Sequence, residues 1–253
     1  MAVDFTQIGS GQEGVLVCHG WFGDHTAFAP TIPYLDTYRF SYAFLDYRGY
    51  GRNRALAGDH SMGEIAADAI SVADRLGWQS FHLVGHSMGG MAVQRIMVDV
   101  PGRVKSVVAL TPVPASGVPF DADGWALFHG AITDDAKRRA IIDYTTGGRL
   151  TPVWLDAMVA ASRATTTQAA FGDYLTSWAK TDFLAEARGN PTPILAVAGE
   201  HDPALNADLM RQTLLAWYPN AALEICANAG HYPMQETPVW LATTMERFMA
   251  RYT

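Results

Sequence analysis

The chain has 253 residues, of which 49% are apolar and 17% are charged, and its formal net charge is −7. This length and composition suit one large α/β domain, or a core domain with an insertion, and they exclude a disordered chain. The acidic balance argues against nucleic acid and anionic membranes as partners, because both favour basic patches.

Strand-like apolar runs alternate with helical periodicity in the first half of the chain. The expected strands are 15–18, 40–49, 81–84 and 104–110. A capping box at Ser61–Glu64 predicts a helix that runs to Leu76, and a second helix is expected over 88–100. Alternating β and α units predict a mostly parallel, twisted sheet flanked by helices.

The alternation breaks after Thr111 and returns at Pro193. The intervening stretch lacks a run typical of a buried strand, and it contains amphipathic pieces instead. These predict helices around 123–131, 134–146, 151–162 and 166–180. The later elements are expected to be strands at 193–199 and 221–226, a helix near 205–217, and a last helix that begins at Thr237-Pro238.

This organisation predicts one core domain with an inserted helical cap. Residues 1–111 and 191–253 are expected to form the α/β core, and 112–190 the cap. A cap placed above the carboxyl ends of the strands would roof the crevice where α/β proteins bind ligands.

The two cysteines, Cys18 and Cys226, each end an apolar run and are expected to be buried thiols. No Cys/His cluster has zinc-ligand spacing, so no metal is expected. The segment MAVDFTQIGSG has neither the basic nor the apolar region of a signal peptide, and no run has the length of a membrane span. These features predict a soluble, cytoplasmic protein.

The segment Gly85-His86-Ser87-Met88-Gly89 stands between an expected strand and an expected helix. Strand, G-x-S-x-G, helix is the pattern of a nucleophile elbow, a strained turn that exposes the serine hydroxyl above the sheet. The glycines leave room where the strand and helix backbones nearly touch. The N–H of Met88 lies at a helix N-terminus and suits a developing oxyanion. Taken alone, the pattern also fits an ordinary glycine-rich turn.

A serine hydroxyl needs a histidine to take its proton and a carboxylate to orient that histidine. His231 lies between the last expected strand and the last helix, and Asp202 lies just past the strand 193–199. Both positions are at the carboxyl edge of the sheet, where Ser87 also emerges. The order Ser87, Asp202, His231 is the order expected for this elbow, with Glu200 as a rival acid.

His19-Gly20-Trp21 follows the strand 15–18, and a glycine-rich turn there can present the N–H of Trp21 as a second oxyanion donor. Large apolar side chains near this turn and in the insertion suggest an apolar or aromatic pocket. The candidate lining residues are Trp21, Phe22, His129, Tyr144, Trp154 and Trp178. Most aromatic residues of the insertion are equally expected to pack helix against helix.

Together these segments resemble the α/β-hydrolase superfamily, in particular its small serine hydrolases with a helical cap. The matching segments, in family order, are His19–Trp21, Asp46–Arg52, Gly85–Gly90, Gly199–Asp202 and Gly230–Pro233. The chain departs from the family at Asn53, where serine is common in a mostly structural segment. Because its elbow carries a serine, the chain does not fit the branches that use an aspartate nucleophile.

The resemblance implies an α/β-hydrolase fold, with Ser87 as the nucleophile, Asp202 as the acid and His231 as the base. The N–H groups of Trp21 and Met88 would form the oxyanion hole, and no cofactor is implied. The expected activity is hydrolysis of a small carboxylic ester, lactone or thioester with an apolar or aromatic part. Relatives also use this triad for carbon–carbon bond hydrolysis, for cofactor-free haloperoxidase or dioxygenase chemistry, or in ligand receptors that hydrolyse slowly, and these stay open as alternatives.

Overall fold

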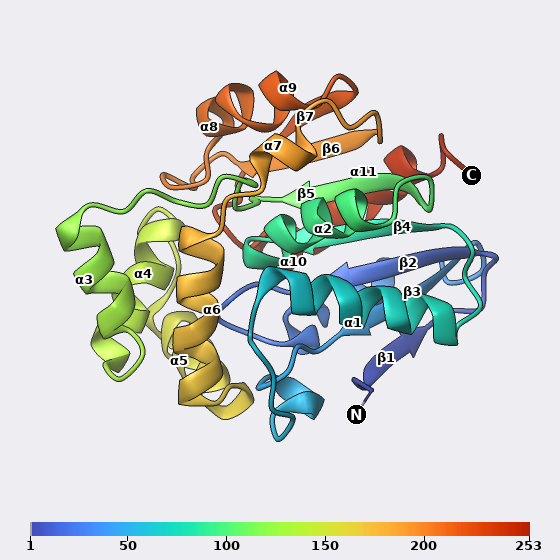
Figure 1. The fold of residues 1–253 in the computed structure, drawn as a ribbon. Coiled ribbons are helices and arrows are strands. Elements are labelled where there is room, and N and C mark those ends of the chain that lie inside the picture. The colour runs from blue at the N-terminus through green and yellow to red at the C-terminus, as the bar shows by residue number, and fades with distance from the viewer. Residues whose placement is uncertain (1) are drawn as a thin grey trace.

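The computed structural model describes residues 2–253 as a seven-stranded sheet with helices on both faces (Figure 1). The strands are β1 (Phe5–Ile8), β2 (Glu13–Cys18), β3 (Phe40–Leu45), β4 (Phe81–His86), β5 (Val104–Leu110), β6 (Ile194–Gly199) and β7 (Ala221–Cys226). Their order across the sheet is β1-β3-β2-β4-β5-β6-β7. Only β1 runs antiparallel to its neighbour, so the expected mostly parallel sheet is confirmed.

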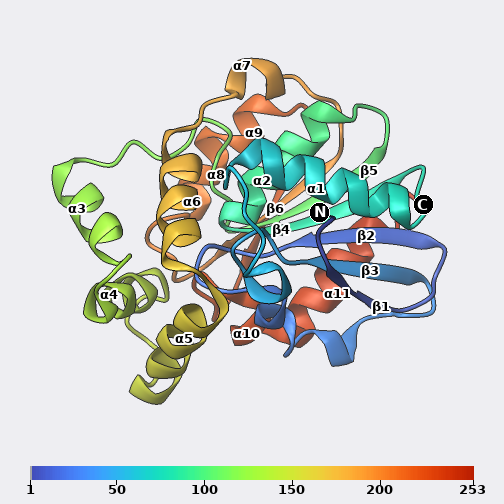
Figure 2. The ribbon, with the colours of Figure 1, turned by 60° about the horizontal axis from the view of Figure 1, so that its bottom comes forward.

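The core helices lie on the two faces of this sheet. They are α1 (Met62–Arg75), α2 (Met88–Asp99), α7 (Leu184–Ala187), α8 (Ala207–Gln212), α9 (Leu214–Trp217), α10 (Pro233–Glu236) and α11 (Pro238–Met249). Helices α1 and α2 cover one face and α11 covers the other (Figure 2). The interior strands β3 and β4 are therefore buried along their whole length, in keeping with their mostly apolar sequences.

Four further helices stand between β5 and β6 in the chain. They are α3 (Ala122–Gly130), α4 (Asp135–Thr145), α5 (Pro152–Thr165) and α6 (Gln168–Lys180). In Figure 1 they lie together on the left, beyond the end of the sheet toward which the parallel strands point. The carboxyl ends of β2, β4, β5 and β6 thus meet one another and face these helices.

Several elements differ from the sequence-based expectation. Strand β1 is short and half-exposed, so it lacks the apolar run that marks the other strands. Strand β3 ends at Leu45, earlier than the expected 49, because the chain turns at Asp46, whose carboxylate accepts hydrogen bonds from the N–H groups of His25 and Arg52. The helix expected near 205–217 is broken at Thr213.

The expected capping box at the start of α1 is only half formed. Ser61 Oγ accepts the N–H of Glu64 at 3.1 Å. The Glu64 carboxylate instead accepts the N–H groups of Asp59 and His60, at 3.0 and 2.9 Å. The glutamate therefore orders the loop before the helix instead of its N-cap residue.

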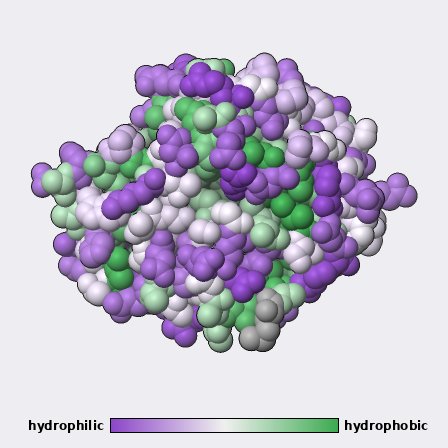
Figure 3. Space-filling model, in the orientation of Figure 1, coloured by the Kyte–Doolittle hydropathy of each residue, from purple (hydrophilic) through white to green (hydrophobic). Residues whose placement is uncertain are grey.

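The face of the molecule seen in Figure 3 is mostly hydrophilic, with small hydrophobic areas between the polar side chains. No helix among residues 2–253 is both long enough and apolar enough to cross a bilayer.

Gly199 at the end of β6 is the tightest glycine position between the sheet and the loop that follows β7. A Cβ atom there would lie 1.9 Å from the carbonyl oxygen of Gly230. We therefore predict that Gly199→Ala lowers the free energy of unfolding by about 2–4 kcal/mol, because the two backbones must move apart.

Gly63→Ala is the matched control. Gly63 is exposed in α1, and a Cβ atom there would meet nothing closer than 3.9 Å. This change should be neutral or stabilise by up to about 1 kcal/mol. Urea unfolding of both variants measures the difference, and a Gly199→Ala variant as stable as the wild type would contradict the prediction.

Candidate active site

Ser87 occupies the sharp turn between β4 and α2. Its backbone has φ 54° and ψ −115°, a region that residues other than glycine rarely adopt. The turn is held by hydrogen bonds from Ser87 N to the carbonyl of Leu110 at 2.9 Å and from Val113 N to the carbonyl of Ser87 at 3.0 Å. The serine is only 9% exposed, and it lines a cavity above the carboxyl ends of the strands.

The two glycines that flank Ser87, Gly85 and Gly89, each avoid a steric clash with a different backbone segment. A Cβ atom at Gly85 would lie 2.3 Å from the carbonyl oxygen of Gly89, which is the close approach of β4 and α2. A Cβ atom at Gly89 would lie 2.4 Å from the carbonyl oxygen of Cys18 at the end of β2. The second glycine therefore makes room for the neighbouring strand and not only for its own turn.

His231 and Asp202 form a buried hydrogen-bonded pair at the same edge of the sheet. Nδ1 of His231 donates to Oδ2 of Asp202 at 2.7 Å. The other carboxylate oxygen, Oδ1, accepts the N–H groups of Ala204 and Leu205 at 2.9 and 3.1 Å. Since the carboxylate accepts, the proton of the neutral imidazole is on Nδ1 and the lone pair is on Nε2.

The loop that carries His231 is held by three elements distant in the chain. The carbonyl oxygen of His231 accepts hydrogen bonds from Nε2 of His86 at 2.8 Å and from Oγ1 of Thr111 at 3.1 Å. Its N–H donates to the carbonyl of Thr145, the last residue of α4, at 3.1 Å. The imidazole is thereby fixed through its main chain as well as through Asp202.

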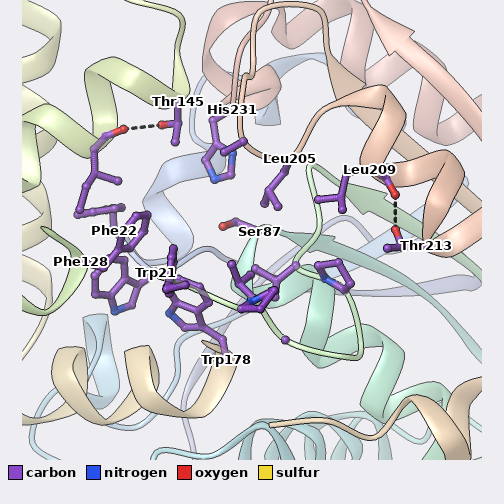
Figure 4. A pocket seen from close by; sticks show the side chains of 18 of the residues that line it. Trp21, Phe22, Ser87, Phe128, Thr145, Trp178, Leu205, Leu209, Thr213 and His231 are labelled. Carbon is purple, nitrogen blue, oxygen red and sulfur yellow. Dashed lines mark hydrogen bonds between the residues drawn. The ribbon is translucent and has the colours of Figure 1, made fainter. Parts of the chain in front are cut away.

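Figure 4 shows the hydroxyl of Ser87 pointing toward the ring of His231. Among the described residues the two side chains form no hydrogen bond, although both line one cavity. Such bonds are often long without substrate and tighten in the reacting complex.

Two N–H groups near Ser87 have no acceptor among residues 2–253. One belongs to Met88 at the start of α2, and the other to Trp21 in the loop after β2. Gly20 brings this loop against the serine, since a Cβ atom on it would lie 3.3 Å from Cβ of Ser87. The arrangement leaves two free donors beside the hydroxyl.

The cavity that contains Ser87 and His231 has a volume of about 320 Å³. In Figure 4, Trp21, Phe22, Phe128 and Trp178 lie on one side of Ser87, which we term the aromatic side. Leu205, Leu209 and Thr213 lie on the other side, which we term the aliphatic side. Apart from Ser87 and His231, few polar side chains face the cavity, so a ligand with apolar parts on both sides of a reacting group would fit it.

The structure brings together half of the predicted pocket residues. Trp21, Phe22 and Trp178 line the cavity. Tyr144 does not, because α4 turns its ring to solvent, where it is 59% exposed. His129 is exposed, on the outer side of α3.

Trp154 also lies outside this cavity. Its indole N–H donates to Oε1 of Gln235 at 3.2 Å, and its ring packs on Tyr232. It lines a smaller neighbouring groove of about 230 Å³, and only Phe22 belongs to both.

The supporting contacts of the site carry no signal in the local sequence. Thr111 has φ 38°, an unusual value for threonine, and Thr145 both lines the cavity and holds the His231 loop. No local pattern marks either residue, because each acts through a partner more than eighty positions away. Leu205 and Leu209 follow Asp202 closely, so their place near the site could have been proposed from that proximity.

Asp24, His25 and Asp46 form a group whose potential ligand atoms lie within 4.8 Å of one another. Their hydrogen bonds account for this arrangement without a metal. Asp24 caps the following turn through the N–H of Thr26, and Asp46 accepts the N–H groups of His25 and Arg52. Asp46 also holds the pKa of His25 above its ordinary value.

Comparisons with known proteins agree with this architecture. The model of a family described as the alpha/beta hydrolase family matches residues 15–244. The solved structure described as Est816, an N-acyl homoserine lactone degrading enzyme, superposes with a TM-score of 0.82 at 23% identity, over 97% of this chain and 96% of that chain.

Two curated relatives match most of this chain. The dihydrolipoyllysine-residue acetyltransferase component of the acetoin cleaving system of Cupriavidus necator is 26% identical over 92% of this chain, which spans 63% of that relative. The 2-heptyl-3-hydroxy-4-quinolone dioxygenase AqdC2 of Rhodococcus erythropolis is 24% identical over 99% of this chain and 96% of its own length. The putative carbamate hydrolase RutD of Caulobacter vibrioides is matched over only 38% of its length.

Three buried histidines make stability depend on pH. Burial lowers the pKa of His19 and His86, and it lowers the pKa of His82 to about 4. Below pH 6.5 the unfolded chain binds protons at these positions that the folded chain does not, so stability falls as pH falls. The pKa of His25 is raised in the fold, so its contribution to stability is fully present below pH 6.5 and is lost only as the pH rises above that value.

We predict that the free energy of unfolding decreases from pH 6.5 to pH 4.5. His82 lies at the far end of β4 from Ser87, so His82→Gln should flatten this slope by about 1 kcal/mol per pH unit without touching the site. Urea unfolding across this pH range measures both slopes. A slope that the substitution leaves unchanged would contradict the assignment of His82 as neutral in the fold.

Proposed function

The chain belongs to the alpha/beta hydrolase family, and we propose that it is a serine hydrolase that cleaves a small carboxylic ester, lactone or thioester. The observation that carries the proposal is the constellation at the edge of the sheet. A serine in a strained strand-to-helix turn faces a histidine whose other ring nitrogen bonds a buried carboxylate at 2.7 Å. Nucleophile, base and orienting acid are the parts that acyl transfer requires.

In the proposed acylation step, Ser87 Oγ attacks the substrate carbonyl while Nε2 of His231 takes the hydroxyl proton. Asp202 keeps the imidazole in the tautomer with Nδ1 protonated and stabilises the imidazolium that forms. The free N–H groups of Trp21 and Met88 would bind the oxyanion. The imidazolium then protonates the leaving oxygen or sulfur, and an acyl-enzyme on Ser87 remains.

In the proposed second step, Nε2 of His231 takes a proton from water, which attacks the acyl carbonyl. The tetrahedral intermediate collapses, Ser87 recovers its proton from the imidazolium, and a carboxylic acid leaves. Each donor and acceptor returns to its initial state, so the cycle needs no cofactor.

We propose that residues 112–190 act as a cap over this site. Phe128, Thr145 and Trp178 from this segment line the cavity, and Leu205 and Leu209 line it from the core. An apolar cavity favours substrates whose acyl or alcohol part is apolar or aromatic. The family match and the likeness to a lactone degrading enzyme support a hydrolase of this kind, and several classes of ester group are compatible with the cavity.

We predict that the wild type hydrolyses p-nitrophenyl esters or lactones with apolar acyl chains faster than those with charged ones.

Ser87→Ala should lower kcat by about 10⁴-fold or more, because the nucleophile is lost, and Asp202→Asn by about 10³–10⁴-fold. Steady-state rates over an ester and lactone panel measure this. Thr243→Ala on α11, exposed and remote from the cavity, serves as the control. Normal turnover by Ser87→Ala would overturn the mechanism.

A second candidate is dioxygenation of a hydroxylated heteroaromatic ring, for which His231 would act as base and Ser87 would not be a nucleophile. The full-length similarity to a relative named as a quinolone dioxygenase favours it, as does the aromatic side of the cavity. Oxygen uptake with a 3-hydroxy-4-quinolone separates the two. We predict no uptake by the wild type. Uptake that Ser87→Ala retains and His231→Ala abolishes would favour the dioxygenase.

A further inference from the structure

Arg138 on α4 is a fully buried cation that the proposed reaction does not use. Its Nε donates to the carbonyl of Ala131 at 2.8 Å, and its Nη1 donates to Oγ of Ser162. Its neighbours Arg139 and Arg163 pair with carboxylates, whereas Arg138 has no carboxylate within 4 Å among the described residues. Burial lowers its pKa to about 10, so it stays charged near neutral pH.

A buried charge without a counter-ion is costly, and it persists where something else compensates. Here the guanidinium lies over the ring of Phe171 on α6, with its central carbon 3.7 Å from the ring centroid. A desolvated cation on an aromatic face is attracted by about 2 kcal/mol. This contact is therefore a main partner of the charge.

The other face of Phe171 bears Trp21. The two ring centroids are 4.0 Å apart with an interplanar angle of 14°. Two groups at these distances cannot share one face of a phenyl ring, so guanidinium, phenyl and indole form one three-layer stack. The indole N–H of Trp21 also donates to the carbonyl of Phe171 at 2.8 Å.

This stack ends at the loop that presents the main-chain N–H of Trp21 beside Ser87. The carbonyl of Trp21 is held by the hydroxyl of Tyr50 at 3.0 Å, so the residue is fixed by its side chain and by one main-chain oxygen. Its N–H has no acceptor among residues 2–253. The indole also contacts Phe22 and Trp178, so its seat on Phe171 is one of the contacts that hold the residue whose N–H faces Ser87.

We propose that Arg138 is a positioning residue for the oxyanion donor at Trp21, acting through the stack with Phe171. The inference rests on the proposed function. Arg138 lies on α4 and lines neither the cavity nor the surroundings of Ser87, so its effect on the rate would come through the orientation of this one N–H group. A misplacement of about 1 Å at such a donor lowers a rate about a hundredfold.

The test compares Arg138→Met, Arg138→Lys and the control Arg139→Met, whose side chain pairs on the surface with Asp156. The probes are a p-nitrophenyl ester that the wild type turns over, and a trifluoromethyl ketone with its methyl ketone analogue. Only the trifluoromethyl ketone forms a stable tetrahedral adduct whose oxyanion needs the donors. In ¹⁵N-indole spectra, with Trp21→Phe to assign the signal, hydrogen exchange of the Trp21 indole reports the stack without any activity.

For Arg138→Met we expect kcat to fall about 10–100-fold with KM within about twofold, as for a donor moved out of place. The affinity for the trifluoromethyl ketone should fall by a similar factor, while the affinity for the methyl ketone stays unchanged. The indole N–H of Trp21 should exchange its hydrogen faster than in the wild type. Arg138→Lys should recover part of each, because it keeps a cation on the ring. Arg139→Met should match the wild type.

A folded Arg138→Met variant with unchanged kcat, ketone affinity ratio and indole exchange would overturn the inference. If this variant does not fold, Arg138→Lys and Phe171→Leu replace it in the same three measurements. Wild-type values in Phe171→Leu would then overturn the inference, because the stack passes through that ring. If the wild type hydrolyses no ester, the proposed function is wrong. The positioning role is then tested by hydrogen exchange alone, and a Trp21 indole that exchanges as slowly in Arg138→Met as in the wild type would overturn it.

Discussion

The reversal of the chain at Ser87, from β4 into α2, is the constraint on which the rest of the site depends. A non-glycine residue with φ 54° costs about 1–3 kcal/mol, and such strain persists only where the surroundings hold it. Here the surroundings are the neighbouring strands. Ser87 N donates to the carbonyl at the end of β5, and Gly89 lies close against the end of β2, so the turn is held by the strands on both sides of β4. The same clamp fixes the hydroxyl above the strand ends.

The histidine depends on contacts of another kind. His231 lies in a loop with no regular structure of its own, yet its carbonyl and N–H are bonded to β4, to the end of β5 and to α4. Helix α4 therefore holds the loop through the N–H of His231, while β4 and the end of β5 hold it through the carbonyl. Trp21 stacks on Phe171 of α6, so the helices between β5 and β6 contact both the His231 loop and the residue that carries one proposed oxyanion donor.

Local sequence patterns predicted the parts of the fold that depend on local chemistry. Apolar runs gave most of the parallel strands, and the positions of Asp202 and His231 past strand ends placed them at one edge with Ser87. The patterns failed where orientation is decided by tertiary packing. The direction of the Tyr144 side chain on α4 depends on the neighbours of that helix. The indole of Trp154 lies outside the cavity because it donates to Gln235 on α10.

The central claim is that Ser87 is an activated nucleophile, and intact-mass analysis after incubation with a fluorophosphonate probe tests it most directly. A serine hydroxyl without a working base reacts negligibly with such a probe. We predict one adduct on the wild type, mapped to the peptide that contains Ser87, and none on Ser87→Ala. An unlabelled wild type, or a label that persists in Ser87→Ala, would contradict the claim.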